Sequence, residues 1–424
     1  MRVRAAVCVV ALLLVAVVGN GDAAGAPRSG HSTALAAGGD LDSAFGLDGM
    51  VTTAFPGGSY ATAVAIQADG KIVAVGAAAG PSVTGDFTVA RYEPDGSLDA
   101  TFSDAGMVTT AIGGGRDEAQ SVAIQENGRI VVAGTDSWRR FAVVRYRPDG
   151  ELDSSFGDGG IVRTNFAPGQ DMAWDVAIQS DGKIVAVGAA GYGQEGFRLA
   201  RYRRDGSLDP AFGDGGKVMT RYGGGVARAV AIQPDGRIVV AGYNTSLALA
   251  RYLPDGRLDR TFAGDGRVDP GRIGEPWPLA VALQPDGRIV VAGGYDIFRV
   301  GLVRFSLHGQ RDRTFGGDGV VVTNMGPGEQ ALGGLVVQPD GKIVTVGYVG
   351  PHEFTDAVVS HFVLLRCRRD GSLDPTFGGD GKVKTFFGDG GSGAAGVALQ
   401  PDGRIVVVGQ SDAPQAFALA RYLA

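Results

Sequence analysis

The feature of this chain that most constrains its fold is a phrase that recurs seven times. The phrase first reads AVAIQADGKIVAVG, and the glycine of its turn marks each copy. The copies fall at Gly70, Gly128, Gly182, Gly236, Gly287, Gly341 and Gly403. A repeated Arg in FTVARYEPDG and a repeated Phe in LDxxFxxxG follow the same period. Copies spaced by about 50–60 residues are typical of a repeat protein, in which each copy forms one structural unit.

Each copy predicts four short β-strands, which in the first unit lie at 61–67, 71–76, 87–92 and 107–110. The Asp-Gly pairs after the first and third strands predict tight turns, because glycine adopts positive φ without a steric penalty. The second strand is apolar on both faces, which fits a strand between two neighbouring blades. The predicted fold is therefore all-β, a single seven-bladed β-propeller of four-stranded blades. A β-solenoid is the alternative, although its repeats are usually shorter and lack hairpin turns.

The two ends of the sequence carry complementary parts of one unit. The fourth-strand phrase LDSAFGLDGMVTT lies near the beginning, and the last residues, FALARYLA, read as a third strand. We expect a strand at 50–53 to pair with the last blade and so close the ring, since closure removes exposed sheet edges.

The passage AVAIQPDGRIVVAG…LALARYLPDGRLDRTF resembles the bacterial delta-60 repeat, an NHL-like propeller repeat. The resemblance covers nearly all of the chain after residue 39, and it is specific because the same spaced phrase occurs seven times. It implies an exported bacterial propeller, and it brings no activity and no catalytic residues with it. The local departures are Phe305 and Cys367 in place of the usual Tyr, and His308 and Asn127 in place of the turn Asp.

The first residues have the order of a secretory signal peptide. Arg2 and Arg4 precede an apolar run from Ala5 to Gly19, and small residues follow it. This run is short for a membrane-spanning helix, which needs about 20 residues, and an uncleaved anchor is the alternative. The expected divisions are a signal peptide at 1–24, a flexible linker at 25–39 and the propeller at 40–424. We therefore expect a secreted or cell-surface protein.

The charge distribution bears on whether the protein binds nucleic acid, and the cysteine content bears on whether it forms a disulfide bond. The net charge is -6, with acidic and basic residues mixed along the chain, and no basic stripe indicates nucleic acid. Cleavage of the signal would remove Cys8 and leave Cys367 alone, so no internal disulfide is expected. We interpret Cys367 as a small, packed core residue.

Residues present in every unit should serve the fold. A protein has one catalytic site, so catalytic residues are expected in some units and not in all seven. The repeated arginines are Arg91, Arg145, Arg201, Arg251, Arg304, Arg366 and Arg421. The repeated aspartates of the Leu-Asp pair are Asp42, Asp99, Asp153, Asp209, Asp259, Asp312 and Asp374. We interpret them as ion pairs that pin the loop between the third and fourth strands, since an Arg fork matches a carboxylate. Seven identical ligand sites are the alternative.

Metal and catalytic motifs are weak. The Asp-Gly phrases at 156–160 and 315–319 could hold calcium, but calcium needs six to eight oxygens and turn formation explains these residues. Calcium thus stays a minor possibility, and no other cofactor is expected. His352 and His361, with Glu353 and Asp356, could hold a metal ion if their loop folded back. No HExxH motif, paired CxxC motif or nucleophile elbow is present.

The loops from the second to the third strand, and from the fourth strand to the next blade, differ in length and chemistry among the units. In a propeller both sets lie on one face, and binding usually uses loops on a rigid scaffold. The candidate binding residues on this rim are Trp138, Arg139, Arg140, Tyr192, Glu275, Trp277, Tyr295, Asp296, His352 and Glu353. Unconstrained variation of the loops is the competing interpretation.

Three functions stay open. The first is an exported binding or scaffolding module for a protein or glycan partner, because exposed aromatic residues with polar neighbours suit such partners. The second is a propeller enzyme, a lactonase-like hydrolase or sugar dehydrogenase with a metal at the channel mouth. Its acids would be Asp117, Glu118, Asp171, Glu275 and Glu329, which precede first strands. The third is a purely structural surface protein.

Overall fold

The computed structural model describes residues 37–79, 85–166, 169–190, 196–221, 225–243, 246–268, 277–296, 298–350, 360–388 and 390–424, with only the backbone for residues 79 and 277–279. The predicted signal peptide and residues 25–36 of the predicted linker lie outside these ranges. No helix within them is long and apolar enough to cross a membrane.

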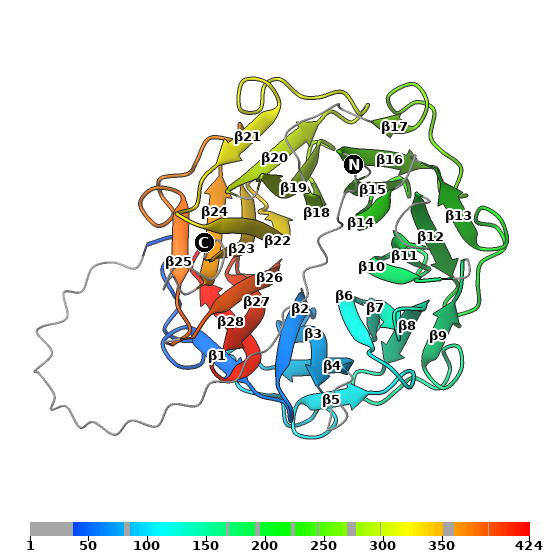
Figure 1. Ribbon diagram of the computed structural model, residues 1–424, viewed down its shortest axis with the longest axis horizontal. Coiled ribbons are helices and arrows are strands. Elements are labelled where there is room, and N and C mark those ends of the chain that lie inside the picture. The colour runs from blue at the N-terminus through cyan, green and yellow to red at the C-terminus, as the bar shows by residue number, and fades with distance from the viewer. Residues whose placement is uncertain are drawn as a thin grey trace, which may run out of the picture. The chain divides into compact units, whose positions relative to one another are not determined.

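The described chain forms seven four-stranded antiparallel sheets arranged as the blades of a ring (Figure 1). Blade 1 contains β2 (Ser59–Ile66), β3 (Ile72–Ala79), β4 (Gly85–Tyr92) and β5 (Met107–Thr110). Blade 2 contains β6 (Glu118–Ile124), β7 (Ile130–Asp136), β8 (Arg140–Tyr146) and β9 (Ile161–Thr164). Blade 3 contains β10 (Met172–Ile178), β11 (Ile184–Ala189), β12 (Phe197–Tyr202) and β13 (Lys217–Thr220). Blade 4 contains β14 (Val226–Ile232), β15 (Ile238–Tyr243), β16 (Leu247–Tyr252) and β17 (Arg267–Val268).

The remaining three blades have the same plan. Blade 5 contains β18 (Trp277–Leu283), β19 (Ile289–Asp296), β20 (Arg299–Phe305) and β21 (Val320–Thr323). Blade 6 contains β22 (Glu329–Val337), β23 (Ile343–Gly350), β24 (His361–Cys367) and β25 (Lys382–Thr385). Blade 7 contains β26 (Ser392–Leu399), β27 (Ile405–Asp412), β28 (Gln415–Tyr422) and β1 (Met50–Thr53). The prediction of an all-β, seven-bladed propeller is confirmed.

The ring is closed by its two ends. Strand β1 pairs with β28 in the register Met50↔Ala420 to Thr53↔Phe417, and the two strands lie side by side in Figure 1. The predicted closing strand at 50–53 is therefore confirmed, residue for residue.

The closure also includes residues that we expected to belong to the linker. The carbonyl of Gly38 accepts the N–H of Gly378 at 2.9 Å. In the neighbouring unit the same bond joins Gly316 to Asp370, the Asp of an Asp-Gly turn. Ala37–Gly38–Gly39 thus takes the place of the Pro-Asp-Gly turn that blade 7 would otherwise lack. Within the described residues, contacts with the ring are therefore made from residue 37 onward.

The first strands β2, β6, β10, β14, β18, β22 and β26 are innermost (Figure 1). Each has a register shift at the same place, such as between Ala173 and Asp175 in β10 and between Ala227 and Ala229 in β14. One residue of each first strand is therefore a β-bulge, a feature that redirects a side chain. The bulge residues are Thr62, Gln120, Trp174, Arg228, Leu279, Gly333 and Ala395.

The hydrophobic core lies between the blades, because each second and third strand is apolar on both faces. One cluster joins Val73 and Val75 of β3 to Ile130 and Val132 of β7, all fully buried. Cys367 packs into such a cluster and is fully buried, and burial raises the pKa of its thiol to about 12. Its interpretation as a core residue is confirmed.

Buried hydrogen bonds between blades supplement this packing. The Tyr at the end of a third strand donates to the Thr that ends the fourth strand of the preceding blade, as Tyr146 does to Thr110 at 2.8 Å. Four other pairs have the same bond at 2.7–2.9 Å, namely Tyr92–Thr53, Tyr202–Thr164, Tyr252–Thr220 and Tyr422–Thr385. Phe305 and Cys367, which replace this Tyr, have no hydroxyl to donate.

Candidate functional site

The repeated Arg and Asp form an ion pair in all seven blades. The nitrogen–oxygen distances lie between 2.6 and 2.9 Å for Arg91–Asp99, Arg145–Asp153, Arg201–Asp209, Arg251–Asp259, Arg304–Asp312, Arg366–Asp374 and Arg421–Asp42. Each guanidinium also lies 4.4–4.8 Å from the centroid of the repeated Phe ring. The prediction that this pair pins the loop between the third and fourth strands is confirmed.

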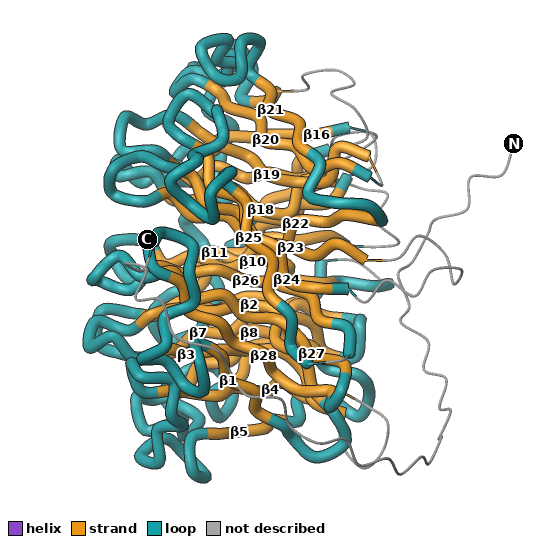
Figure 2. The backbone as a smooth tube through the Cα atoms, turned by 90° about the vertical axis from the view of Figure 1, so that its left-hand side faces the viewer, coloured by secondary structure: helices purple, strands orange, loops and turns teal. Residues whose placement is uncertain are grey.

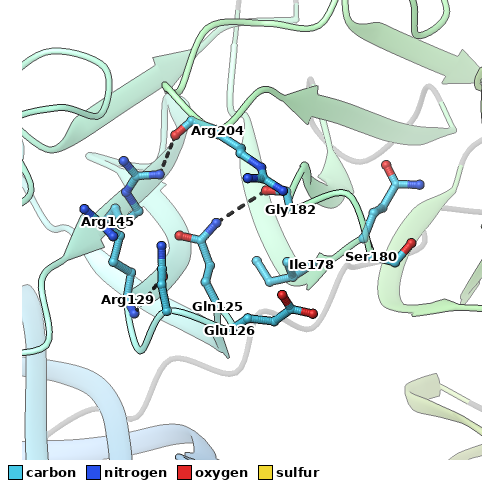
Figure 3. A pocket seen from close by; sticks show the side chains of 10 residues that line it. Gln125, Glu126, Arg129, Arg145, Ile178, Ser180, Gly182 and Arg204 are labelled. Carbon is cyan, nitrogen blue, oxygen red and sulfur yellow. Dashed lines mark hydrogen bonds between the residues drawn. The ribbon is translucent and has the colours of Figure 1, made fainter.

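The arginine also joins one blade to the next, which the sequence did not indicate. In Figure 3, Arg145 of blade 2 donates to the carbonyl of Arg204 in blade 3, and the amide of Gln125 donates to the carbonyl of Gly182 at 3.4 Å. The equivalent arginines 91, 201, 251, 304 and 421 each donate to a turn carbonyl of the following blade. We call this arrangement the arginine staple.

A cavity of about 290 Å³ opens beside the staple between blades 2 and 3, lined by Arg129, Arg145 and Arg204 among others (Figure 3). A cavity of about 470 Å³ occupies the equivalent seam between blades 3 and 4, next to Arg201. Because the same cavity recurs at successive seams, we interpret it as a consequence of the repeat and look elsewhere for a single binding site.

Six of the staple aspartates have a lowered pKa, namely Asp99, Asp153, Asp209, Asp259, Asp312 and Asp374. Burial by itself would raise the pKa of Asp99, but hydrogen bonds from Lys71 and Thr101 outweigh it and lower the pKa well below its usual range. The pKa of Asp374 is set by the same opposing effects. Burial raises it, but hydrogen bonds from Thr376 and the charge of Arg366 outweigh burial and lower the pKa to about 2. The carboxylates of these six residues therefore remain charged at neutral pH.

The loops that vary among the units meet on the opposite face. The N–H of Asp117, which precedes β6, donates to the carbonyl of Gly85, at the start of β4, at 2.7 Å. We call this side the variable-loop face. It carries the loops between second and third strands and those from each fourth strand to the next blade. Figure 2 shows loops at both ends of the strands.

On the variable-loop face, the hairpin between β7 and β8 carries Trp138, which is half-buried. Ser137 and Trp138 have φ of 51° and 59°, and the N–H of Arg139 donates to the carbonyl of Asp136 at 2.8 Å. Positive φ at both central residues defines a type I′ turn, which favours Asn-Gly. A non-glycine residue in this region is strained by about 1–3 kcal/mol, and such strain clusters at functional sites. A tryptophan here is therefore an unfavourable choice for the fold.

Two buried carboxylates hold this turn. Asp117 is fully buried and accepts the N–H groups of Ser137 at 2.8 Å and of Ile112 at 2.8 Å. Asp136 is 1% exposed and pairs with Arg140 at 2.6 Å and with Arg163 at 3.2 Å.

Two glycines beside the turn leave room for its side chains. A Cβ on Gly113 would lie 2.3 Å from the carboxylate of Asp136, and a Cβ on Gly115 would lie 2.8 Å from the hydroxyl of Ser137. Larger residues would therefore clash at both positions. The turn is thus clamped in its strained conformation.

A polar cluster lies next to Trp138 across the seam between blades 1 and 2. Glu118 accepts a hydrogen bond from Tyr60 at 2.5 Å and pairs with Arg116 at 2.5 Å. The Arg116 guanidinium also lies 5.9 Å from the Trp138 ring centroid, and its side chain is 52% exposed. Burial, and then the charge of Glu118, raises the pKa of Tyr60, so its hydroxyl stays protonated and donates. The result is an aromatic platform beside an exposed cation and a carboxylate.

A second hairpin tip, between β19 and β20, has a related composition. Asp296 pairs with Arg299 at 2.6 Å, and the Arg299 guanidinium lies 5.1 Å from the Tyr295 ring centroid. Phe298 is 41% exposed at this tip, and the backbone of Trp277 pairs with Gly294 just below it.

The structure thus places Trp138, Arg139 and Arg140 on one hairpin and Tyr295 and Asp296 on another. The remaining candidates, Tyr192, Glu275, His352 and Glu353, lie outside the described residues, as does the side chain of Trp277.

Two of the acids considered for an enzyme have structural contacts. The carboxylate of Asp117 is occupied by backbone N–H groups as described, and Asp171 is fully buried and accepts the N–H of Phe166 at 2.7 Å. In the Asp-Gly loops, Asp318 accepts the N–H of Val320 at 3.0 Å, as a turn-forming residue does. Over the ranges that the structure describes, no three His, Cys, Asp or Glu residues lie close enough to hold a metal ion.

Sequence reasoning missed Tyr60, Arg116 and the bulge residue Arg228. Tyr60 and Glu118 occupy the same position in blades 1 and 2, and only the closed ring brings them within hydrogen-bonding distance. A signal for Arg228 did exist, since no other unit has a charged residue at the bulge position.

Comparison with known proteins supports the fold and leaves the activity open. The sequence profile of a family described as "Domain of unknown function (DUF5122) beta-propeller" matches this chain in seven segments, at residues 67–102, 125–156, 179–212, 233–262, 284–315, 338–377 and 400–424. A search of curated proteins found no match.

Among solved structures, virginiamycin B lyase from Staphylococcus aureus is 9% identical, with a TM-score of 0.51, over 88% of this chain and 99% of the lyase. The extracellular domain of a putative one component system from B. thetaiotaomicron is 12% identical, with a TM-score of 0.44, over 88% of this chain and 40% of that one. A gluconolactonase from Xanthomonas campestris is 14% identical, with a TM-score of 0.39, over 72% and 86% of the two chains. At these identities the likeness concerns the fold alone.

Proposed function

Since this chain belongs to the DUF5122 β-propeller family, whose description assigns no activity, we propose from its own geometry that it is an exported binding module. Its binding surface is the variable-loop face, and its partner is a protein or a glycan. The observation that carries the proposal is the position of Trp138 in a strained type I′ turn, clamped by the buried carboxylates of Asp117 and Asp136.

The neighbours of Trp138 support a polar partner. Arg116, which pairs with the buried carboxylate of Glu118, places a cation beside the indole ring, and Arg139 is exposed on the same tip. Tryptophan, tyrosine and arginine are the residues that most often dominate binding energy at interfaces. Export is supported by the order of charged, apolar and small residues at 1–26, and by the resemblance to delta-60 repeats.

An enzyme draws less support from the same face. Asp117 and Asp171, two of the acids that such a site would need, are already bonded to backbone N–H groups. Neither is left to act as a general acid or base in the arrangement described.

Trp138→Ala should weaken partner binding while the ring stays folded. Losing a central aromatic contact typically costs at least about 2 kcal/mol of binding free energy, a factor of about 30 in Kd. The measurement is binding of the full chain to an array of glycans and to extracellular proteins from a bacterium that encodes it, with circular dichroism to verify folding.

The matched control is Leu307→Ala, which removes a large hydrophobic side chain, 45% exposed, but from the turn after β20 on the opposite face of the ring. It should retain binding. Equal binding by wild type and Trp138→Ala would show that the hairpin is not the binding surface.

A further inference from the structure

A second site lies on the inner wall of the ring, away from the Trp138 hairpin. Trp174 and Arg228 are the bulge residues of the innermost strands β10 and β14, which are neighbours in Figure 1. The guanidinium of Arg228 stacks on the Trp174 ring, 3.7 Å from its centroid, and lies 5.9 Å from the centroid of Tyr243. Bulges redirect side chains and often occur next to active sites.

Arg228 is held without a counter-charge. Its Nε is buried and has no hydrogen-bond partner, and within the described ranges it forms no ion pair with a carboxylate. The staple residues Arg201, Arg366 and Arg421 also have a buried Nε without a hydrogen bond, but each is paired with its aspartate at 2.9 Å. Arg228 as a whole is only partly exposed. Arginines largely removed from water are almost always paired, and an uncompensated charge in such a place is destabilising.

The other units show that the fold does not need a cation here. The corresponding bulge residues are threonine, glutamine, tryptophan, leucine, glycine and alanine. Thr62, for example, donates to the carbonyl of Ala119 in the next first strand at 2.9 Å, so a small polar residue satisfies the same place. Arg228 is therefore an addition to the repeat.

We propose that Arg228, stacked on Trp174 and hydrogen-bonded to Tyr243, binds an oxyanion, either the carboxylate or the phosphate or sulfate group of a small ligand. The anion would supply the missing counter-charge, and the planar guanidinium presents several N–H donors that match two oxygens of such a group. Burial lowers the pKa of Arg228, which accords with a charge that gains from a bound anion. This site is independent of the proposed partner surface at Trp138.

The test uses the full chain and four probes, namely sodium acetate, glucuronate, phosphate and sulfate, against sodium chloride at equal ionic strength. Tryptophan fluorescence reports directly, because Trp174 lies under the guanidinium. At least one probe should give a saturable change, and at 100 times its Kd it should raise Tm by about 3 °C. Saturation by the two carboxylates or by the two inorganic anions identifies the source of the group.

Arg228→Gln should raise that Kd at least tenfold and remove the rise in Tm, and without any probe it should melt at the same temperature as wild type or higher. Arg228→Lys, which keeps the charge but loses the planar fork, should bind more weakly than wild type. The control is Arg257→Gln, which removes an exposed arginine paired with Asp255 and should change neither Kd nor Tm rise. The proposal is wrong if no probe saturates, if Arg228→Gln binds as wild type does, or if that variant melts lower without probe.

Discussion

Removal of residues 1–53 should leave a chain that no longer unfolds in one cooperative transition, whereas removal of residues 1–36 should leave the unfolding curve unchanged. The first described residues already contact the ring, because Gly38 completes the missing turn of blade 7. Both deletions shorten the same end, so the comparison isolates the closure itself.

The expected effect is large because several contacts are lost together. Phe45 is fully buried under Arg421, and losing such a side chain costs about 3–5 kcal/mol. Asp42 pairs with Arg421 at 2.9 Å and with Arg404 at 2.7 Å, and one-sided removal of a buried pair costs a further 3–5 kcal/mol or so. The sum is comparable with the whole stability of a typical domain, about 5–15 kcal/mol.

Denaturant unfolding followed by fluorescence and circular dichroism provides the measurement. Addition of a peptide of residues 37–53 to the shorter chain should restore part of the stability. A shorter chain that unfolds with the wild-type midpoint would mean that the pairing of β1 with β28 does not close the ring.

Asp153→Ala should lower the free energy of unfolding by about 3–5 kcal/mol, because it leaves the guanidinium of Arg145 buried and unpaired. Asp153 is 3% exposed and bonds to Arg129 at 2.7 Å as well as to Arg145 at 2.9 Å. The matched control is Asp149→Ala in the adjacent turn, whose side chain is 55% exposed and which should cost well under half as much. Equal losses in the two variants would contradict a specific role for the staple.

The same ion pairs set the acid limit of the fold. For Asp374 the pKa is lowered to about 2 in the folded protein, against about 3.9 in an unfolded chain. The stability that this group contributes is complete above the unfolded value and is lost as the pH falls toward about 2. Wild type should therefore lose stability progressively below pH 4, and Asp153→Ala should lose less over that range because it has one staple carboxylate fewer.

Much of the fold could be predicted from the sequence because the repeat supplies seven copies of each observation. The turn glycines, the closing strand at 50–53 and the pairing of Arg145 with Asp153 all rest on residue types that recur in register. The turn at Gly38–Gly39 was missed because its Asp is replaced by glycine and its other half lies at the far end of the chain.

The binding surface was harder to predict for a physical reason. The partner of Arg145 in the next blade is a backbone carbonyl, which has no sequence signature. The positive φ of Trp138 and the contact between Tyr60 and Glu118 depend on the path of loops that differ from unit to unit. The repeat pattern predicts what is shared among blades, and the proposed binding site consists of residues that are not shared.

The central claim is that repeated residues hold the ring and that residues departing from the repeat, Trp138 first, serve binding. The most direct test is the free energy of unfolding of the double variant Ser137→Asn/Trp138→Gly, which gives the type I′ turn its preferred sequence. We predict a gain of about 1 kcal/mol from the relieved strain, together with loss of partner binding. A loss of stability of 1 kcal/mol or so would show instead that Trp138 serves the fold, and it would contradict the account.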